Sequence, residues 1–234
     1  MATKANPTYM VTGKVRASYF FGIVPAKDTD DNGNEVIKFR TQILIDKTDK
    51  ETLLKIKACI AATMKDPKAI QKWGGSVPAK MKTPLRDGDT ETNEDGEPLP
   101  KDIYGGKWFM NVGTTDKPGI LGPNGEPPYL LDDEGHPLRD NVHGGLKYDP
   151  QFIVSGDYVR VSLKFYGYKN KGNKGVTAGL NNIQLLKKGE QIGGKRRAED
   201  DFADGFVDDD DPENDPIGAN AAFDDDDPLK ALLG

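Results

Sequence analysis

Four stretches of the chain alternate apolar residues with cationic and aromatic residues. Because side chains on a strand point in turn to its two faces, each stretch would collect its cations and rings on one face. A cation can neutralise a phosphate of a nucleic acid, and a flat ring can stack on an unpaired base. The residues that this pattern selects are Arg16, Phe20, Lys38, Arg40, Lys107, Phe109, Arg160, Lys164, Tyr166 and Tyr168.

The opposite faces of the same stretches are apolar, as the inner wall of a small barrel requires. A duplex has no free base faces, so rings on the polar faces favour a single-stranded ligand and little base specificity. The residues expected to point inward are Val11, Val15, Ala17, Tyr19, Ile37, Phe39, Ile43, Ile45, Trp108, Met110, Val112, Val159, Val161, Leu163 and Phe165.

Two basic loops could close over a nucleic-acid backbone. One spans residues 77–89, and the other is the turn at 169–175, which follows Tyr168 directly. Lysine and arginine in such loops would add phosphate contacts to those of the strands. The loop cations that we expect to bind DNA are Lys80, Lys82, Arg86, Lys169 and Lys171.

Catalytic and cofactor motifs are absent from the sequence. His136 and His143 have no cysteine partners at metal-ligand spacing. Residues 189–195 read G-x-x-x-x-G-K, but Arg196 stands where a phosphate-binding loop needs Ser or Thr. We therefore expect no catalytic residue, no cofactor, no metal and no small-molecule substrate, that is, a protein that is not an enzyme.

The elements that would position these residues are strands, with one main helix after the first hairpin. Thr48 and Glu51 form a capping-box pattern that predicts where the helix begins, and Pro67 marks its end. Five strands without a βα alternation indicate a mainly-β fold, an OB-like five-stranded Greek-key barrel. The strands are predicted at 9–21, 36–46, 106–113, 156–170 and 176–188, with two long loop excursions at 74–106 and 117–145.

Charge divides the chain into two parts. Residues 1–197 hold 31 Lys+Arg and 24 Asp+Glu, a net +7, whereas residues 198–234 hold 1 and 14, a net −13, which together give the formal −6. We interpret 1–197 as the DNA-binding domain and 198–234 as a disordered acidic tail. The tail residues expected to contact a partner protein are Asp224, Asp225, Asp226, Asp227, Leu229, Leu232 and Leu233.

Membrane insertion and disulfide formation are not expected. The longest apolar runs fall short of the roughly 18 residues of a membrane-spanning helix, and the N-terminus lacks the apolar core of a signal peptide. Cys59 is the single cysteine, so no internal disulfide is possible, which fits a reducing cytoplasm.

The order of several motifs resembles the single-stranded DNA-binding proteins of tailed phages. The motifs are KVRASYFFG, KFRTQILIDKTD, PLRDGD, SGDYVRVSLKFYGYKNKGNKGV and LNNIQLLKKGE, and the resemblance covers nearly all of Tyr9 to Gly194. It implies an OB fold, a role in phage DNA replication, recombination and repair in the cytoplasm of the infected bacterium, and an acidic C-terminus that contacts replication or recombination proteins. Relatives that end in a terminal Phe differ from this chain, which ends PLKALLG.

Three other functions remain open on the sequence. A recombination mediator that anneals complementary strands would use the same polar faces. A metal-dependent nuclease would need clustered carboxylates, and Asp132, Asp133 and Glu134 are the only dense group before the tail. A virion or scaffold protein would not bind nucleic acid at all.

Overall fold

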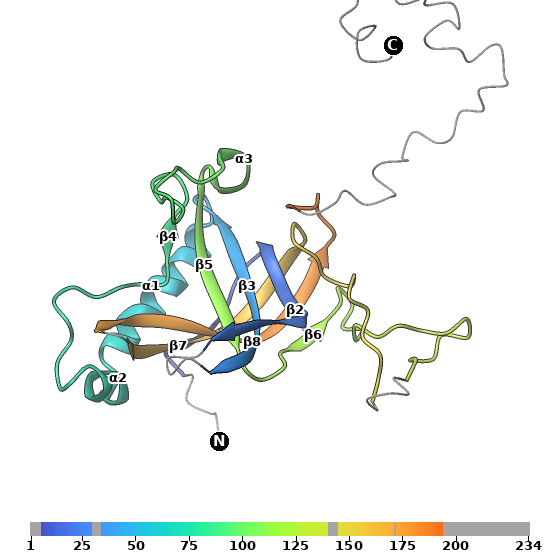
Figure 1. The fold of residues 1–234 in the computed structure, drawn as a ribbon, viewed down its shortest axis with the longest axis horizontal. Coiled ribbons are helices and arrows are strands. Elements are labelled where there is room, and N and C mark those ends of the chain that lie inside the picture. The colour runs from blue at the N-terminus through green and yellow to red at the C-terminus, as the bar shows by residue number, and fades with distance from the viewer. Residues whose placement is uncertain (1–5, 30–33, 140–144, 171, 194–234) are drawn as a thin grey trace, which may run out of the picture. The chain divides into compact units, whose positions relative to one another are not determined.

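The computed structural model describes residues 6–29, 34–139, 145–170 and 172–193 of the chain (Figure 1). All of them belong to a unit that spans 1–194, and the predicted domain boundary at 197 stays a prediction. The elements are β1 (Tyr9–Val11), β2 (Val15–Thr29), β3 (Glu35–Asp46), α1 (Lys50–Met64), α2 (Pro67–Lys72), β4 (Arg86–Asp87), α3 (Lys101–Tyr104), β5 (Lys107–Thr114), β6 (Gly119–Leu121), β7 (Tyr158–Asn170) and β8 (Asn173–Lys187).

Five of the strands close into a barrel. β2 pairs with β3, β3 with β5, β5 with β8, β8 with β7, and β7 again with β2. All of these pairings are antiparallel except β5 with β8, which meet in parallel at Gly113 and Gly179. The ring confirms the predicted mainly-β, OB-like five-stranded barrel.

Short elements were missing from the sequence prediction. The single strand expected at 9–21 is two strands, because β1 pairs with β7 while β2 starts afresh at Val15. Beside α1, the described residues contain the short helices α2 and α3 and the short strands β4 and β6. Figure 1 shows α1 and α2 on one side of the barrel and α3 near one end of β5.

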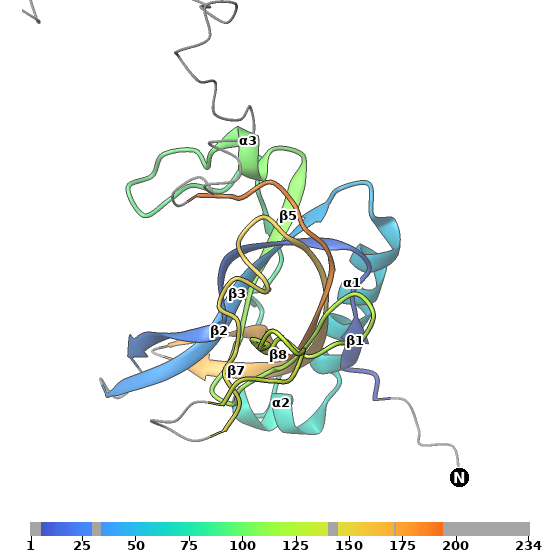
Figure 2. The ribbon, with the colours of Figure 1, turned by 90° about the vertical axis from the view of Figure 1, so that its right-hand side faces the viewer.

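The barrel interior is filled by the apolar faces that alternation predicts. Inward residues such as Ile43, Met110 and Val161 are 0% exposed. Ile37 differs: it is 57% exposed, because the β2–β3 hairpin extends beyond the ring, as Figure 2 shows. Val11 of β1 and Tyr19 of β2, also expected inside, are 42% and 64% exposed. Alternation therefore describes most of the barrel wall and fails at these positions and where the hairpin leaves the ring.

The N-terminus of α1 is capped one residue later than the capping-box pattern predicts. The Asp49 side chain accepts a hydrogen bond from the Thr52 backbone N–H at 3.0 Å, so α1 begins at Lys50. Thr48 is instead bound by Asp46, whose carboxylate accepts from its hydroxyl at 2.6 Å. None of the helices in the described ranges has the length and hydropathy needed to span a bilayer.

Candidate nucleic-acid interface

An irregularity in β2 decides which of its aromatic rings face solvent. The pairing with β3 shifts register between Ser18 and Phe21, and Tyr19 adopts a left-handed backbone with φ 46°. Tyr19 is 64% exposed as a result, although alternation placed it in the core. Phe20 is half-buried against the main core, and its predicted role in DNA binding stays a prediction. Tyr19 and Phe21 become the rings that β2 offers to a ligand.

These rings border a groove of about 770 Å³ on the outside of the barrel. We call it the barrel-face groove; its lining crosses β2, β3, β5, β7 and β8. Four of the predicted DNA-binding residues meet there: Lys38, Arg40, Lys164 and Tyr166. The lining also includes Tyr19, Phe21, Asp28, Gln42 and Asn111, none of which the sequence prediction named as a DNA-binding residue.

Cations stand at the rim of the barrel-face groove. Lys38 and Arg40 both face Asp28, at 3.1 and 3.7 Å, and the side chains of all three are partly exposed. The Arg40 guanidinium also lies 5.5 Å from the centroid of the Phe21 ring. Exposed ion pairs of this kind contribute little to stability, so a phosphate can compete with Asp28 for both cations.

The floor of the groove is a polar network. The Gln42 side-chain amide donates to Asn111 Oδ1 at 3.0 Å, and the Tyr104 hydroxyl donates to Gln42 Oε1 at 2.7 Å. Gln42 is only 8% exposed, whereas Asn111 is exposed. The exposed Asn111 amide, oriented by Gln42, can hydrogen-bond a base edge beside rings that stack on base faces.

Phe109 points out of the barrel, as alternation predicts, but it is 2% exposed. It is paired with Leu44 across the β3–β5 ladder, and both lie in a second core cluster with Tyr104 of α3. The Tyr104 ring meets it edge-on with centroids 5.2 Å apart. Phe109 cannot stack on a base, and its predicted role is wrong, because α3 covers this face of β5.

Arg16 and Arg160 are held by contacts within the protein. The Arg16 guanidinium donates to the backbone oxygens of Gly156 at 2.9 Å and Glu190 at 2.6 Å. Arg160 donates to Gln184 Oε1 at 2.6 Å. Neither lines the barrel-face groove, so the structure does not bring these two predicted residues to the interface.

Arg86 and Lys107 lie near the Phe109 cluster and also make internal contacts. Arg86 binds Glu91 at 2.7 Å, a hydrogen bond that raises the pKa of the Arg86 guanidinium and lowers the pKa of the Glu91 carboxyl. Lys107 donates to the Gly105 backbone oxygen at 3.2 Å. Both predicted DNA contacts therefore lie outside the barrel-face groove.

Of the remaining predicted cations, Lys82 and Lys169 lie at the β7–β8 hairpin. Lys80, Lys82 and Lys169 are exposed, and the loop of Lys82 is tied to β8 by its backbone, which accepts from the Val176 N–H at 2.9 Å. Tyr168 is half-buried. Lys171 lies outside the described residues, as do the tail residues Asp224, Asp225, Asp226, Asp227, Leu229, Leu232 and Leu233, so these predictions stay predictions.

Within the described ranges, one group of three side chains could meet around a metal ion: Asp132, Glu134 and His136. All three are exposed, and one Asp132 oxygen already accepts from the backbone N–H groups of Glu134 and His136. This arrangement is that of a side-chain-stabilised turn. The group does not line the barrel-face groove, so it offers the nuclease alternative no metal centre beside the candidate interface.

The family model of the single-stranded DNA-binding protein of Enterobacter phage Enc34 matches residues 8–213. This chain belongs to that family. The phage family inferred from the motif order is thereby confirmed.

Individual proteins are also similar to this chain. The putative protein p50 of Acyrthosiphon pisum secondary endosymbiont phage 1 is 26% identical over 167 residues, which cover 71% of this chain and 78% of p50. The solved structure of the Enc34 protein matches with a TM-score of 0.54 and 20% identity over 86% of this chain and 96% of that one. The structure of the Enc34 protein in complex with single-stranded DNA matches with a TM-score of 0.57 and 21% identity, over 82% of this chain and 97% of that one. These likenesses confirm the fold.

Proposed function

We propose that this protein binds single-stranded DNA, with little base preference, across the barrel-face groove. Membership of the Enc34 family supports single-stranded DNA as the ligand, and the Enc34 protein has been solved in complex with single-stranded DNA. OB folds bind oligonucleotides on the face of their second and third strands, between two hairpin loops. Here β3 and β5 take those positions.

The observation that carries the proposal is the composition of one groove. Lys38, Arg40 and Lys164 can neutralise phosphates, while Tyr19 and Tyr166 are 64% and 44% exposed rings within the same lining. Rings accept every base because every base has a π-face, and cations accept every phosphate. The groove therefore favours a single strand over a duplex and accepts many sequences.

The biological role in our proposal follows the family resemblance. The protein would coat and protect single-stranded DNA during phage replication, recombination and repair, in the cytoplasm of the infected bacterium. The acidic segment 198–234 would recruit replication or recombination proteins. The protein would have no catalytic activity of its own, and labelled single-stranded DNA should stay intact after incubation with the protein and Mg²⁺ or Mn²⁺.

A pair of substitutions with opposite effects tests the groove. Arg40→Gln should weaken binding to fluorescent oligo-dT, because it removes a phosphate partner. Asp28→Asn should tighten binding, because it removes the anion that faces Lys38 and Arg40. Each change should amount to about 0.2–1 kcal/mol, the range of one exposed charge pair. Anisotropy titrations at matched salt measure both.

Lys147→Gln is the control, since Lys147 is exposed and outside this groove. It matches the charge change of Arg40→Gln. If Lys147→Gln weakens binding as much as Arg40→Gln, or if wild-type protein binds duplex as tightly as oligo-dT, the proposed interface is wrong.

A further inference from the structure

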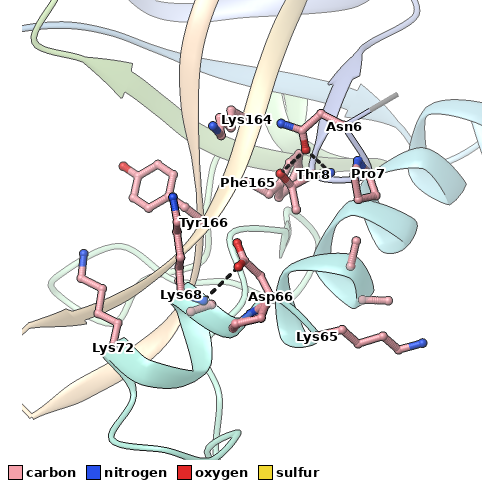
Figure 3. A pocket seen from close by; sticks show the side chains of 15 residues that line it. Asn6, Pro7, Thr8, Lys65, Asp66, Lys68, Lys72, Lys164, Phe165 and Tyr166 are labelled. Carbon is pink, nitrogen blue, oxygen red and sulfur yellow. Dashed lines mark hydrogen bonds between the residues drawn. The ribbon is translucent and has the colours of Figure 1, made fainter. Parts of the chain in front are cut away.

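A second groove, of about 940 Å³, lies between the α1–α2 corner and β7 (Figure 3). We call it the helix-corner groove. Its charged lining consists of four lysines and one aspartate, a net +3: Lys65, Lys68, Lys72, Lys164 and Asp66. The sequence patterns selected only Lys164, because the other three belong to helical segments rather than to alternating strands.

The packing of α2 on β7 sets the position of this groove. A Cβ on Gly167 would lie 2.7 Å from Ala69 Cβ, so only glycine allows α2 to approach β7 this closely. Trp73, at the end of α2, is 1% exposed, and its indole N–H donates to the backbone oxygens of Tyr168 at 3.0 Å and Gly175 at 3.2 Å. The lysines of α2 are therefore held beside β7.

The two grooves meet at β7. Lys164 and Tyr166 line both of them, and their side chains share the outer face of the strand. In Figure 3 the Lys68 side chain extends toward Tyr166, whereas Lys65 points away from β7. A DNA strand that stacks on Tyr166 in the barrel-face groove would thus reach Lys68 and Lys72 in the adjoining helix-corner groove.

These lysines are available to an anion. Among the described residues, no ion pair joins Lys68, Lys72 or Lys164 to an acid, and Lys68 and Lys72 are exposed. The carboxylate of Asp66 accepts the backbone N–H of Lys68 at 2.9 Å and caps α2. A phosphate that enters the groove therefore does not have to displace an acidic side chain from these lysines.

We propose that single-stranded DNA continues from the barrel-face groove past Tyr166 into the helix-corner groove, where Lys68 and Lys72 bind its phosphates. This inference rests on the proposed function and extends its footprint. The barrel face would hold bases on its rings, and the helix corner would hold the backbone through charge. The helix-corner groove would then contribute only when the DNA is long enough to reach it.

The experiment compares two lengths of fluorescent oligo-dT, about 6 and about 16 nucleotides, within the footprint range of one OB fold. The double variant K68Q/K72Q is titrated against wild type between about 50 and 200 mM salt. The charge-matched control is K50Q/K147Q, which changes two exposed lysines outside both grooves. Thermal melting checks that both variants fold like wild type.

For the longer oligonucleotide, K68Q/K72Q should lower the magnitude of the log–log salt slope by about 1.4, since each phosphate contact to a single strand contributes about 0.7. Its affinity at the lowest salt should fall several-fold. Binding to the shorter oligonucleotide should match wild type, and the control should match wild type at both lengths.

Three results would overturn the extension: an unchanged slope on the longer DNA, an equal loss on both lengths, or an equal loss in the control. These results leave the proposed function intact as long as wild type prefers oligo-dT to duplex and Arg40→Gln weakens both lengths. If wild type binds neither length, both proposals fail.

Discussion

At the scale of single residues, the function of a ring depends on what covers it. Phe109 and Tyr166 both point out of the barrel, yet one is 2% exposed and the other 44%. α3 covers Phe109, while Tyr166 stands between two open grooves. The same residue class therefore stabilises the fold at one position and is free to bind DNA at the other.

Tyr166→Ala should weaken DNA binding and spare stability. Loss of one stacking ring costs about 1–3 kcal/mol of binding free energy, and Tyr166 is too exposed to contribute much packing. Anisotropy with oligo-dT and a denaturant melt on the same preparation measure both quantities. A large drop in the unfolding midpoint, with binding unchanged per folded molecule, would contradict the assignment.

Phe109→Ala should do the reverse. Removing a buried phenylalanine costs about 3–5 kcal/mol of unfolding free energy, here by emptying the cluster with Leu44 and Tyr104. Affinity corrected for the folded fraction should change little. A well-folded Phe109→Ala protein with weak DNA binding would show that the ring is accessible to a base after all.

At the scale of elements, the break in β2 is what moves a tyrosine out of the core. A left-handed backbone costs a residue other than glycine roughly 1–2 kcal/mol, and Tyr19 adopts one at φ 46°. Outliers of this kind concentrate at functional sites. The shift carries Tyr19 and Phe21 to the barrel-face groove and leaves Phe20 half-buried against the core.

Tyr19→Gly should separate stability from function. Glycine adopts the left-handed conformation without strain, so the unfolding free energy should stay level or rise by up to about 1 kcal/mol, the entropy of glycine offsetting part of the gain. DNA binding should weaken by about 1–3 kcal/mol through loss of the ring. Tyr19→Ala is the companion variant, since it removes the ring but keeps the strain. If Tyr19→Gly binds DNA like wild type, Tyr19 is not a stacking residue.

At the scale of the whole molecule, two parts of the chain carry opposite net charges. Residues 198–234 carry −13 and are tethered to a part that carries +7. Tethering holds a segment at an effective concentration on the order of millimolar. An acidic segment of this kind can occupy cationic grooves as a mimic of the phosphate backbone.

Truncation after Arg197 should therefore tighten binding to oligo-dT, most strongly at low salt, because salt screens the internal competition as well. Full-length and truncated protein titrated across a salt series provide the measurement. Equal or weaker binding of the truncated protein at low salt would rule out competition and leave partner recruitment as the proposed role of the segment.

Much of the barrel follows from the sequence alone. Alternation in β3, β5 and β7 identifies Ile43, Met110 and Val161 as core, because a strand's period of two is a local property. The same rule places Lys38, Arg40 and Tyr166 on the outward faces of their strands. The motif order identifies the family, since it depends on the chain alone.

Tertiary structure decided the rest of the candidate interface. The left-handed backbone at Tyr19 turns its ring to the surface, because the register of β2 depends on its partner strand. α3 buries Phe109, and α2 brings Lys68 and Lys72 to β7 through the contact of Ala69 with Gly167. These contacts join segments far apart in the chain, so a pattern that compares neighbouring residues cannot reveal which outward face stays open to DNA.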